Sequence, residues 1–570
     1  MLHSPLSDTR TSMTFKLICS LALFLILALG QSSAAEKLKG APGSIKIDAA
    51  GITYYAQERD TLITIAKQFT ASTNNWEALG KLNQIGNDRA IPIGYGILIP
   101  VELLVEEASQ ATVVALAGNV KAIQAGSTET NLAVGSIVYE GNQINTEKNS
   151  FVTFALPDDS RVSVPSNSQV SLSKLRMTKY VKSPRTLIKL VQGRVESRVS
   201  PLNNNKGRFE VSSPLAIAGV RGTHFRVGVN DNGIANEVLE GGVAVGNKEK
   251  PNAIVLPAGQ GNIVSSAGVG KAIDLLPAPS LLDGFQLQER PSLQFAINPV
   301  PNAISYRAQI AKDANVQNVI AENMGQDLRF KFDGISDGQY FIRITAIDKN
   351  QLEGIPSTTA FTLKARPEPP FLLHPKHKVR ATNVDFKWTQ SSEAKSYHLQ
   401  VATDATFKQI VLDQANIDAA EFSTGALGIH QYFWRVASVI EKNGVVDQGP
   451  YSPVQSFNVL PPQSMNTFAD NGENQINFSW PAEPGQSFLV QLSSDADFKK
   501  LLLSKELDQP NLTIPRPEAG TYYIRVRATD ADRIIGSFSK PQKFDIVLRW
   551  TTSSGEPLNS GSGAVQPNKQ

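Results

Sequence analysis

The stretch from Ala216 to Val227 holds the densest group of residues that could do chemistry. It reads AIAGVRGTHFRV and contains two glycines, two arginines, a threonine and one of the six histidines of the chain. Three kinds of site have this composition: a glycine-rich loop that holds phosphate, a catalytic histidine, and a tight corner between strands. The choice among them separates an enzyme from a binding module.

The first two kinds of site lack their required companions. A phosphate loop ends in Gly-Lys-Ser/Thr before a helix, whereas here Thr223 directly follows Gly222 and HFRVGV alternates like a strand. A catalytic histidine needs a nucleophile and an orienting partner, and no signature in the chain supplies them for His224. We therefore predict that Gly219 and Gly222 form backbone corners, that Arg221 binds a nearby carbonyl or carboxylate, and that His224 is a surface or satisfied side chain without a catalytic role.

Length and composition indicate several exported domains. The 570 residues correspond to about three to six domains, and the net charge of +3 gives no general attraction to nucleic acid. The single cysteine, Cys19, lies in an apolar run that follows Lys16 and precedes GQSSAA. This run is shorter than the roughly 20 residues of a membrane span but suits a secretory signal. We expect a signal peptide at residues 1–35, no membrane span after its cleavage, and a periplasmic, secreted or cell-envelope location.

Residues 51–101 predict a small module of strand, two helices and strand. A β-type run at Ile52–Ala56 precedes Asp60, which we expect to cap a helix from about Thr61. A second helix follows, and GILIP closes the module as a strand. With Leu82-Asn83 and Gly94, these pieces make the segment resemble the LysM module, which binds peptidoglycan and chitin. Two positions depart from the LysM pattern, because Arg59 replaces a glycine and Ile93 replaces a proline.

The LysM resemblance implies where a glycan would lie. In such modules the sugar occupies a shallow groove between the loop before the first helix and the loop before the last strand. The corresponding residues here are Asp60, Thr61, Leu62, Ile91, Pro92 and Ile93. The alternative is that Asp60 only caps a helix and that the module is a spacer.

Residues 112–270 predict an all-β domain. Short alternating runs are separated by Gly, Asn, Asp and Ser, without helical periodicity. VGSIVYEGNQINT, FALPDDSRVSV, VQGRV, VSSPLAIAGVRGTHFRV and VLEGGVAV occur in the order that resembles the FecR domain. FecR proteins are membrane-spanning regulators with a cytoplasmic domain. At most 16 residues precede the apolar run here, so we expect an envelope β-domain without that signalling role.

This domain also carries a local excess of positive charge. Residues 151–230 contain 13 Lys and Arg against four Asp and Glu. Such residues on strands usually form a solvated face. The sharper alternative is contact with an anionic envelope polymer or lipid headgroup.

The C-terminal half contains three copies of one unit. SYRAQIAKDANVQNVI, SYHLQVATDATFKQIV and SFLVQLSSDADFKKLL align without gaps at a spacing of 91 residues, and YFIR, YFWR and YYIR follow in the same order. This period predicts sandwiches that resemble fibronectin type III domains, at residues 285–365, 375–460 and 465–548, before a disordered tail at 549–570.

The repeats show no catalytic pattern. Asp313, Asp404 and Asp495 are expected to begin turns, and Trp388, Trp434 and Trp480 to fill cores, with a carbohydrate platform as the alternative. His374 and His377 lack a third ligand for a metal.

The fold class we predict is mainly β and multidomain: a small βααβ LysM-like module, an all-β FecR-like domain and three tandem β-sandwiches. We expect a non-catalytic envelope adaptor without cofactor or metal. Its partners would be peptidoglycan glycan strands and another envelope protein or an anionic envelope polymer, not nucleic acid. The alternative is an envelope ligand sensor acting through the FecR-like domain, and a peptidoglycan hydrolase is disfavoured because no catalytic signature is present.

Overall fold

The fold is mainly β, as the sequence predicts: strands hold 54% of the residues and helices 4%. The computed structural model describes residues 39–48, 50–87, 90–124, 129–201, 207–220, 222–248, 253–465, 467–469, 474–550, 552–554, 558–560 and 563–564. The predicted signal peptide and Arg221 lie outside these residues. Two compact units are present. The first contains the N-terminal module, the β-domain and most of the first sandwich, and the second contains the other two sandwiches.

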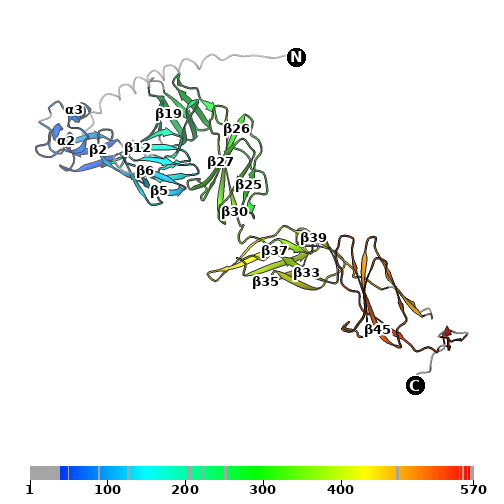
Figure 1. Cartoon of the computed structure of the whole chain (residues 1–570). Coiled ribbons are helices and arrows are strands. Elements are labelled where there is room, and N and C mark those ends of the chain that lie inside the picture. Colours follow the sequence, from blue (N-terminus) through cyan, green and yellow to red (C-terminus); the bar gives the residue numbers. More distant parts are fainter. Residues whose placement is uncertain are drawn as a thin grey trace, which may run out of the picture. The chain divides into compact units, whose positions relative to one another are not determined.

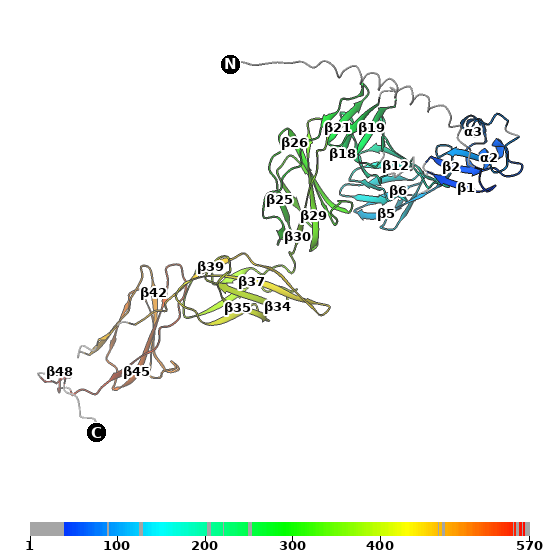
Figure 2. The same cartoon turned by 180° about the vertical axis from the view of Figure 1, so that it is seen from behind.

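The N-terminal module has the predicted strand–helix–helix–strand order and one further strand. Its elements are β1 (Ile45–Asp48), β2 (Gly51–Tyr55), α2 (Leu62–Phe69), η1 (Thr73–Asn75), α3 (Trp76–Asn83) and β3 (Gly96–Pro100). The sheet order is β1-β2-β3, and Figure 2 shows β1 beside β2. Leu62, Ile65 and Phe69 recur at helical spacing on α2 and are buried in the module's core. The extra strand makes the sheet three-stranded.

The predicted helix cap at Asp60 is wrong by one residue. Thr61 is the N-cap of α2: its hydroxyl accepts from the amide of Thr64, and the Thr64 side chain accepts from the amide of Thr61. The Asp60 carboxylate instead accepts from the Tyr54 hydroxyl at 2.7 Å and from the Gln57 amide at 2.8 Å. Tyr54 is buried and its hydroxyl needs an acceptor, which Asp60 supplies.

The β-domain consists of two long sheets with one apolar core between them. The chain crosses repeatedly from one sheet to the other, so that hairpins alternate between the two. The first sheet has the order β22-β21-β18-β17-β14-β11-β10-β5-β8, and the second has the order β20-β19-β16-β15-β13-β12-β9-β6-β7. Buried Val, Ile, Leu and Phe side chains from both sheets form the core.

The strands of the β-domain begin with β4 to β9, which are β4 (Glu106–Ala108), β5 (Gln110–Ala117), β6 (Val120–Ile123), β7 (Thr130–Asn131), β8 (Ile137–Tyr139) and β9 (Gln143–Thr146). The middle strands are β10 (Phe151–Ala155), β11 (Arg161–Val164), β12 (Gln169–Thr178), β13 (Pro184–Gln192), β14 (Arg194–Arg198), β15 (Arg208–Ser212) and β16 (Ala216–Val220). The last strands are β17 (His224–Asn230), β18 (Gly233–Glu240), β19 (Gly242–Asn247), β20 (Ala253–Pro257), β21 (Gln260–Ser265), β22 (Gly268–Val269) and β23 (Ile273–Asp274).

The two glycines of AIAGVRGTHFRV have different roles. Gly222 has a φ of 62°, and a Cβ there would lie 3.0 Å from the Cα of Pro201, so this corner requires glycine as predicted. Gly219 is not at a corner. It lies inside β16, and a Cβ built on it meets nothing within 4 Å. Its lack of a side chain leaves open space on the outer face of the second sheet.

The three C-terminal repeats each form two facing sheets. The first sandwich contains β24 (Leu287–Gln288), β25 (Leu293–Ala296), β26 (Ala303–Ala311), β27 (Val319–Gly325), β28 (Arg329–Phe332), β29 (Gly338–Asp348) and β30 (Ser357–Leu363). The second contains β31 (Leu372–His374), β32 (Lys378–Arg380), β33 (Asn383–Trp388), β34 (Ser396–Ala402), β35 (Ile410–Ile417), β36 (Glu421–Ala426), β37 (Gln431–Lys442), β38 (Val445–Tyr451) and β39 (Gln455–Leu460). The third contains β40 (Thr467–Ala469), β41 (Gln475–Ser479), β42 (Ser487–Ser493), β43 (Leu501–Leu507), β44 (Asn511–Pro515), β45 (Gly520–Thr529) and β46 (Gln542–Ile546).

A hairpin of the β-domain joins the N-terminal module to the rest of the first unit. Tyr180 and Val181, in the turn between β12 and β13, pack into the module's core, and the Tyr180 ring lies 5.4 Å from that of Phe69. Arg185 on β13 donates to the carbonyl of Val101 at 3.3 Å. Two residues of the β-domain thus extend the core of the module, and Figure 1 shows the module beside the β-domain.

The tail at 549–570 contains a short antiparallel pair in the part that the structure describes. These strands are β47 (Asn559–Ser560) and β48 (Gly563–Ala564). Four residues of the tail that the composition predicts to be disordered thus lie in short strands.

Replacing Arg59 tests the cost of its backbone conformation. Arg59 has a φ of 70°, and its side chain is exposed. A side chain in this region costs about 1–2 kcal/mol relative to the right-handed one, whereas glycine adopts it readily. We expect Arg59→Gly to raise the free energy of unfolding of the first unit by up to about 1 kcal/mol in urea titrations, and Arg59→Ala to give no gain. Equal effects of the two variants would contradict this explanation.

Candidate functional site

The structure brings together the two loops on which the LysM resemblance places a glycan. The amide of Gly94 donates to the carbonyl of Ala56 at 2.7 Å, and the amide of Ala56 donates to the carbonyl of Tyr95 at 3.0 Å. These bonds tie the loop before α2 to the loop before β3. Loop residues far apart in the sequence thus lie side by side.

The six candidate residues differ in their accessibility. Pro92 and Ile93 are exposed, and Ile93 keeps 56% of its surface. Asp60, Thr61 and Ile91 are half-buried. Leu62 is 1% exposed and packs in the module's core, so its side chain is not available to a sugar. Of the six candidates, Pro92 and Ile93 are therefore exposed, Asp60, Thr61 and Ile91 are partly accessible, and Leu62 is not accessible.

Asp60, in the loop before α2, forms a polar pair with Tyr54 of β2. Burial raises the pKa of Tyr54, and the hydrogen bond to Asp60 together with the charge of that carboxylate raises it further. The tyrosine therefore stays protonated and keeps donating to Asp60. Asp60 is thus held in one position by two donors, and this fixes the loop before α2.

Residues that precede β1 cover one end of the same loops. The amide of Gly40 donates to the carbonyl of Gly94 at 3.0 Å, and that of Gly43 donates to Tyr55 at 2.7 Å. A Cβ on Gly40 would lie 2.6 Å from the Tyr55 ring, so the glycine allows the segment to lie on that ring. Sequence reasoning missed this segment, because its only signal is a pair of glycines.

The positive charge of residues 151–230 is largely paired with acidic residues from other parts of the chain. Lys174 and Arg185 contact Glu106, Arg176 contacts Glu140, and Lys182 contacts Glu107. Arg194 and Arg226 bind Glu353 in the first sandwich. Lys174, Arg176 and Lys182 stay 40%, 43% and 64% exposed, as a solvated face predicts. Arg185, Arg194 and Arg226 are instead largely buried and are neutralised by acids from other parts of the chain. The same pairing weakens the case for an anionic polymer as partner.

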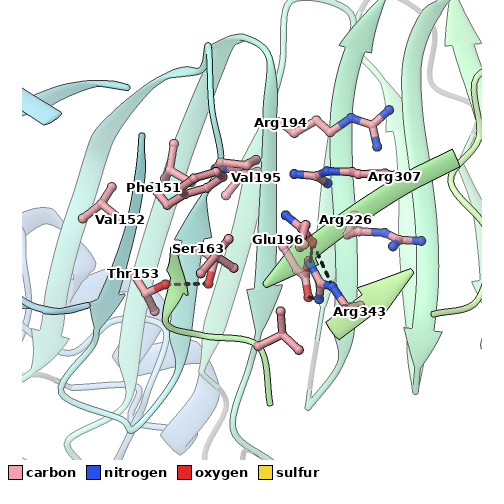
Figure 3. Close-up of a pocket in the computed structure, with 15 residues that line it drawn as sticks. Phe151, Val152, Thr153, Ser163, Arg194, Val195, Glu196, Arg226, Arg307 and Arg343 are labelled. Carbon is pink, nitrogen blue, oxygen red and sulfur yellow. Dashed lines mark hydrogen bonds and ion pairs between the residues drawn. The ribbon is translucent and has the colours of Figure 1, made fainter. Parts of the chain in front are cut away.

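A buried network of charges joins the β-domain to the first sandwich (Figure 3). It contains four arginines and four glutamates: Arg194, Glu196, Arg226 and Glu237 from the β-domain, and Arg307, Glu322, Arg343 and Glu353 from the sandwich. Their formal charges cancel. Figure 3 shows Arg307 and Arg343 pointing toward the side chains of the β-domain.

Glu353 is the centre of this network. It is fully buried and forms ion pairs with Arg194, with Arg226 at 3.2 Å and with Arg307 at 3.1 Å, and it accepts from the Thr345 hydroxyl at 2.7 Å. Burial alone would raise the pKa of Glu353, but the charges of Arg226, Arg307 and Arg194 outweigh it and hold the pKa well below its usual range. Glu353 is therefore ionised at neutral pH.

A second centre of the network lies at Glu196 on β14. Arg343 of the first sandwich donates to both carboxylate oxygens of Glu196, at 2.8 and 2.9 Å. His224 Nε2 lies 2.8 Å from Oε1 of the same carboxylate, while Arg198 Nη2 lies 3.3 Å from His224 Nδ1. His224 is buried and holds the carboxylate that binds the sandwich. As expected, His224 is a satisfied side chain, and its role at this contact is structural.

The pocket drawn in Figure 3 is a packing gap at this junction. Its volume is about 20 Å³, and its lining includes Phe151, Val195 and Val316 together with five residues of the network, Arg194, Glu196, Arg226, Arg307 and Arg343. About 10–15 Å³ holds one water, whereas ligand sites measure roughly 300–1,000 Å³. This pocket has no room for an organic substrate.

The other candidate residues from the sequence lie in sandwich cores or in turns. The three tryptophans are buried in the cores of their sandwiches: Trp388 and Trp434 in the second and Trp480 in the third. They are therefore not available to stack on a sugar, and the carbohydrate-platform alternative is wrong. Asp404 accepts from the amides of Thr406 and Gln409 at a turn, as expected. Among the described residues no cluster of three or more His, Cys, Asp or Glu could hold a metal, and no helix is long and apolar enough to cross a membrane.

Comparison with known proteins agrees with one of these domains. Residues 142–244 match the family model of the FecR protein. Within the chain, therefore, a FecR-like domain is present, and it contains AIAGVRGTHFRV. No curated protein matches the sequence.

Two sets of solved structures are similar to parts of the chain. Crystal structures of a candidate anti-sigma factor from Parabacteroides distasonis ATCC 8503 are 21% identical over 23% of this chain and 57% of theirs, with a TM-score of 0.19. The FN1–FN3 domains of chicken CNTN1 are 14% identical over 47% of this chain and 97% of theirs, also with a TM-score of 0.19. The chain thus spans little more than half of the anti-sigma factor's length. These similarities carry no argument about function.

Neutralising Glu353 tests whether the network holds the junction. Glu353→Gln leaves the buried Arg226 and Arg307 and the partly buried Arg194 without their common carboxylate, and losing one partner of a buried ion pair costs about 3–5 kcal/mol. We expect the first unit to lose about that much free energy of unfolding in urea. Glu240→Gln is the control, because Glu240 is 68% exposed and lies 3.9 Å from His224, so its effect should stay within about 0.5 kcal/mol. Equal effects would show that the network contributes nothing specific.

The pH dependence of stability should carry the same signature. The lowered pKa of Glu353 means that its contribution is complete above the unfolded-state value of about 4.5 and declines as the pH falls from there through the folded-state pKa. Urea unfolding at a series of pH values should therefore show a steeper loss of stability below pH 4.5 in the wild type than in Glu353→Gln. Identical slopes for the two proteins would contradict this assignment.

Proposed function

We propose that the protein is a non-catalytic adaptor of the bacterial cell envelope that binds peptidoglycan glycan strands through its N-terminal module. One observation carries the proposal: hydrogen bonds tie the loop before α2 to the loop before β3, and these loops hold the exposed Pro92 and Ile93 and the half-buried Thr61. Exposed apolar side chains beside backbone polar groups suit the faces and acetamido groups of a glycan. The FecR-like domain supports an envelope location.

The way the module is attached supports an anchoring role. Its core contains Tyr180 and Val181 of the β-domain, so force on a bound glycan passes directly into the β-domain. The network around Glu353 then connects the β-domain to the first sandwich. An anchor at one end of such a chain raises the effective concentration of the sandwiches at the wall.

An envelope ligand receptor is the second candidate, and one observation favours it. An open groove of about 790 Å³ lies on the outer face of the second sheet of the β-domain. Leu187, Glu210, Gly219, Ala244 and Val255 form one row across its floor, in register from β13 to β20. Its size lies within the range of ligand sites, and Gly219 leaves its centre open.

Cosedimentation with purified peptidoglycan sacculi tests the adaptor. The wild type should pellet with sacculi, and Ile93→Glu should lower the bound fraction at least about fivefold, because a charge replaces an apolar contact in the groove. Ile63→Glu is the matched control, since Ile63 is also exposed (43%) and lies on α2 of the same module. Equal losses in both variants would point to a general surface effect. If the wild type stays in the supernatant, the adaptor proposal is wrong and the ligand receptor is the remaining candidate.

A further inference from the structure

The three sandwiches repeat one polar pair on the same two strands. A glutamine and an arginine face each other in register, and the arginine Nε and Nη2 both donate to the glutamine Oε1. The pairs are Gln309–Arg343 (2.9 and 2.5 Å), Gln400–Arg435 (3.0 and 2.7 Å) and Gln491–Arg525 (2.9 and 2.7 Å). In each sandwich the glutamine therefore orients the guanidinium in the same way.

The first sandwich shows what this guanidinium can bind. The remaining edge of Arg343 donates to both carboxylate oxygens of Glu196 on the β-domain. Next to this ion pair, Val316 of the sandwich packs in one cluster with Phe151 of the β-domain. The face of the first sandwich around Arg343 thus binds the carboxylate of Glu196, with the apolar side chain of Phe151 beside it.

The second and third sandwiches keep the arginine but bury its two faces in aromatic rings. The Arg435 guanidinium lies 3.9 Å from the ring centre of Phe407 and 4.1 Å from that of Tyr451. Arg525 lies 4.0 Å from Phe498 and 4.1 Å from Phe538. Stacking fixes the plane of the guanidinium and leaves its edge for a ligand.

The first sandwich has a valine where the other two have one of these rings. Val316, Phe407 and Phe498 occupy equivalent turns, with φ values of 55°, 58° and 57°. In the first sandwich Phe151 from the β-domain packs against this valine. The other two sandwiches supply the aromatic ring themselves.

Arg525 of the third sandwich has less negative charge near it than Arg435 of the second. In the second sandwich Asp413 contacts Gln400 and lowers the net charge around Arg435. The equivalent residue of the third sandwich is Ser504, which lies 3.4 Å from Gln491. Among the described residues no carboxylate pairs with Arg525. Burial and the charge of nearby Arg527 lower the pKa of Arg525, whereas a bound carboxylate would raise it.

The strand at the edge of this face is also apolar and uncovered. Leu501 and Leu502 on β43 are 45% and 55% exposed, whereas the equivalent strand of the first sandwich, β27, packs against β5 and β10 of the β-domain. Ser504, Gln491 and Arg525 lie in register across β43, β42 and β45, so the arginine and the exposed leucines belong to one sheet. Arginine and aromatic side chains are enriched at sites that bind another protein.

We propose that the face of the third sandwich around Arg525 docks a partner protein that presents an aspartate or glutamate side chain next to an apolar one. The partner's carboxylate receives the Nη1 and Nη2 donors of Arg525, as Glu196 receives those of Arg343, and its apolar side chain covers Leu501 and Leu502. Arg435 forms a weaker second site because Asp413 competes for its charge. This inference deepens the proposed function by giving the third sandwich a partner, but it does not depend on glycan binding by the N-terminal module, so the two can fail separately.

A titration of the full-length protein with a small probe tests the carboxylate site. The probe is the dipeptide acetyl-Phe-Glu-amide, and acetyl-Phe-Gln-amide is its uncharged match. With ¹⁵N-labelled arginine, the Nε–Hε signal of Arg525 should shift saturably with the glutamate peptide and about tenfold more weakly with the glutamine peptide. The Arg343 signal should not move, because Glu196 holds that edge. Equal binding of both peptides, or an equal shift of Arg343, would overturn the site.

Two conservative variants separate the fork of Arg525 from its charge. Arg525→Lys keeps the positive charge but not the two parallel donors, so it should weaken binding of the glutamate peptide about tenfold. Arg527→Lys should keep the affinity within about twofold. A wild-type affinity for Arg525→Lys would overturn the proposal.

Crosslinking in the native host tests that the carboxylate belongs to a protein. A photo-reactive residue at Leu502 should form a protein adduct that Arg525→Glu abolishes and Arg527→Gln leaves in place. Reversing the charge of the partner's carboxylate at the mapped contact should restore the adduct with Arg525→Glu. The proposal is overturned if no adduct forms, if the adduct persists in Arg525→Glu, or if the mapped contact lacks an aspartate or glutamate.

Discussion

The structure of the first unit depends on one buried charge, the carboxylate of Glu353. It lies in the first sandwich and meets arginines from both sides of the junction, Arg307 from its own sandwich and Arg194 and Arg226 from the β-domain. An ion removed from water is tolerated only when its partners and hydrogen bonds are in place. A shift of the junction that separated Glu353 from Arg194 and Arg226 would leave buried charge with fewer partners, which is strongly unfavourable.

Apolar contacts and charges have different roles at this junction. Phe151, Val316 and Val319 remove apolar surface from water without fixing a register. The bidentate contact between Arg343 and Glu196 supplies direction, because two parallel donors match one carboxylate. His224 completes this contact by holding Glu196 from the β-domain side. The FecR-like motif thus helps to join domains.

The repeats show how one face serves different purposes. A shared Gln–Arg pair is kept in all three sandwiches, while the residue beside it changes from Val316 to Phe407 and Phe498. In the first sandwich the smaller residue gives room to Phe151 of the β-domain. In the others the ring covers the arginine itself. The same fold therefore gives one face that is occupied and two whose guanidinium edges are open.

The sequence by itself determined the mainly β fold class, the position of the FecR-like motif and the repeats, because these depend on local periodicity and spacing. It also predicted the corner at Gly222 and the buried tryptophans. The helix cap was misplaced from Thr61 to Asp60, because the buried Tyr54 hydroxyl claims the Asp60 carboxylate.

Only the tertiary structure decided what the charges do. The basic residues of the β-domain find acids as distant as Glu353, and no local pattern in the sequence records a pairing across more than a hundred residues. For the same reason the sequence did not show that His224, which has no partner nearby in the sequence, is buried in contact with Glu196. Coulomb attraction in a low-dielectric interior depends on separation in space, and only folding sets that separation.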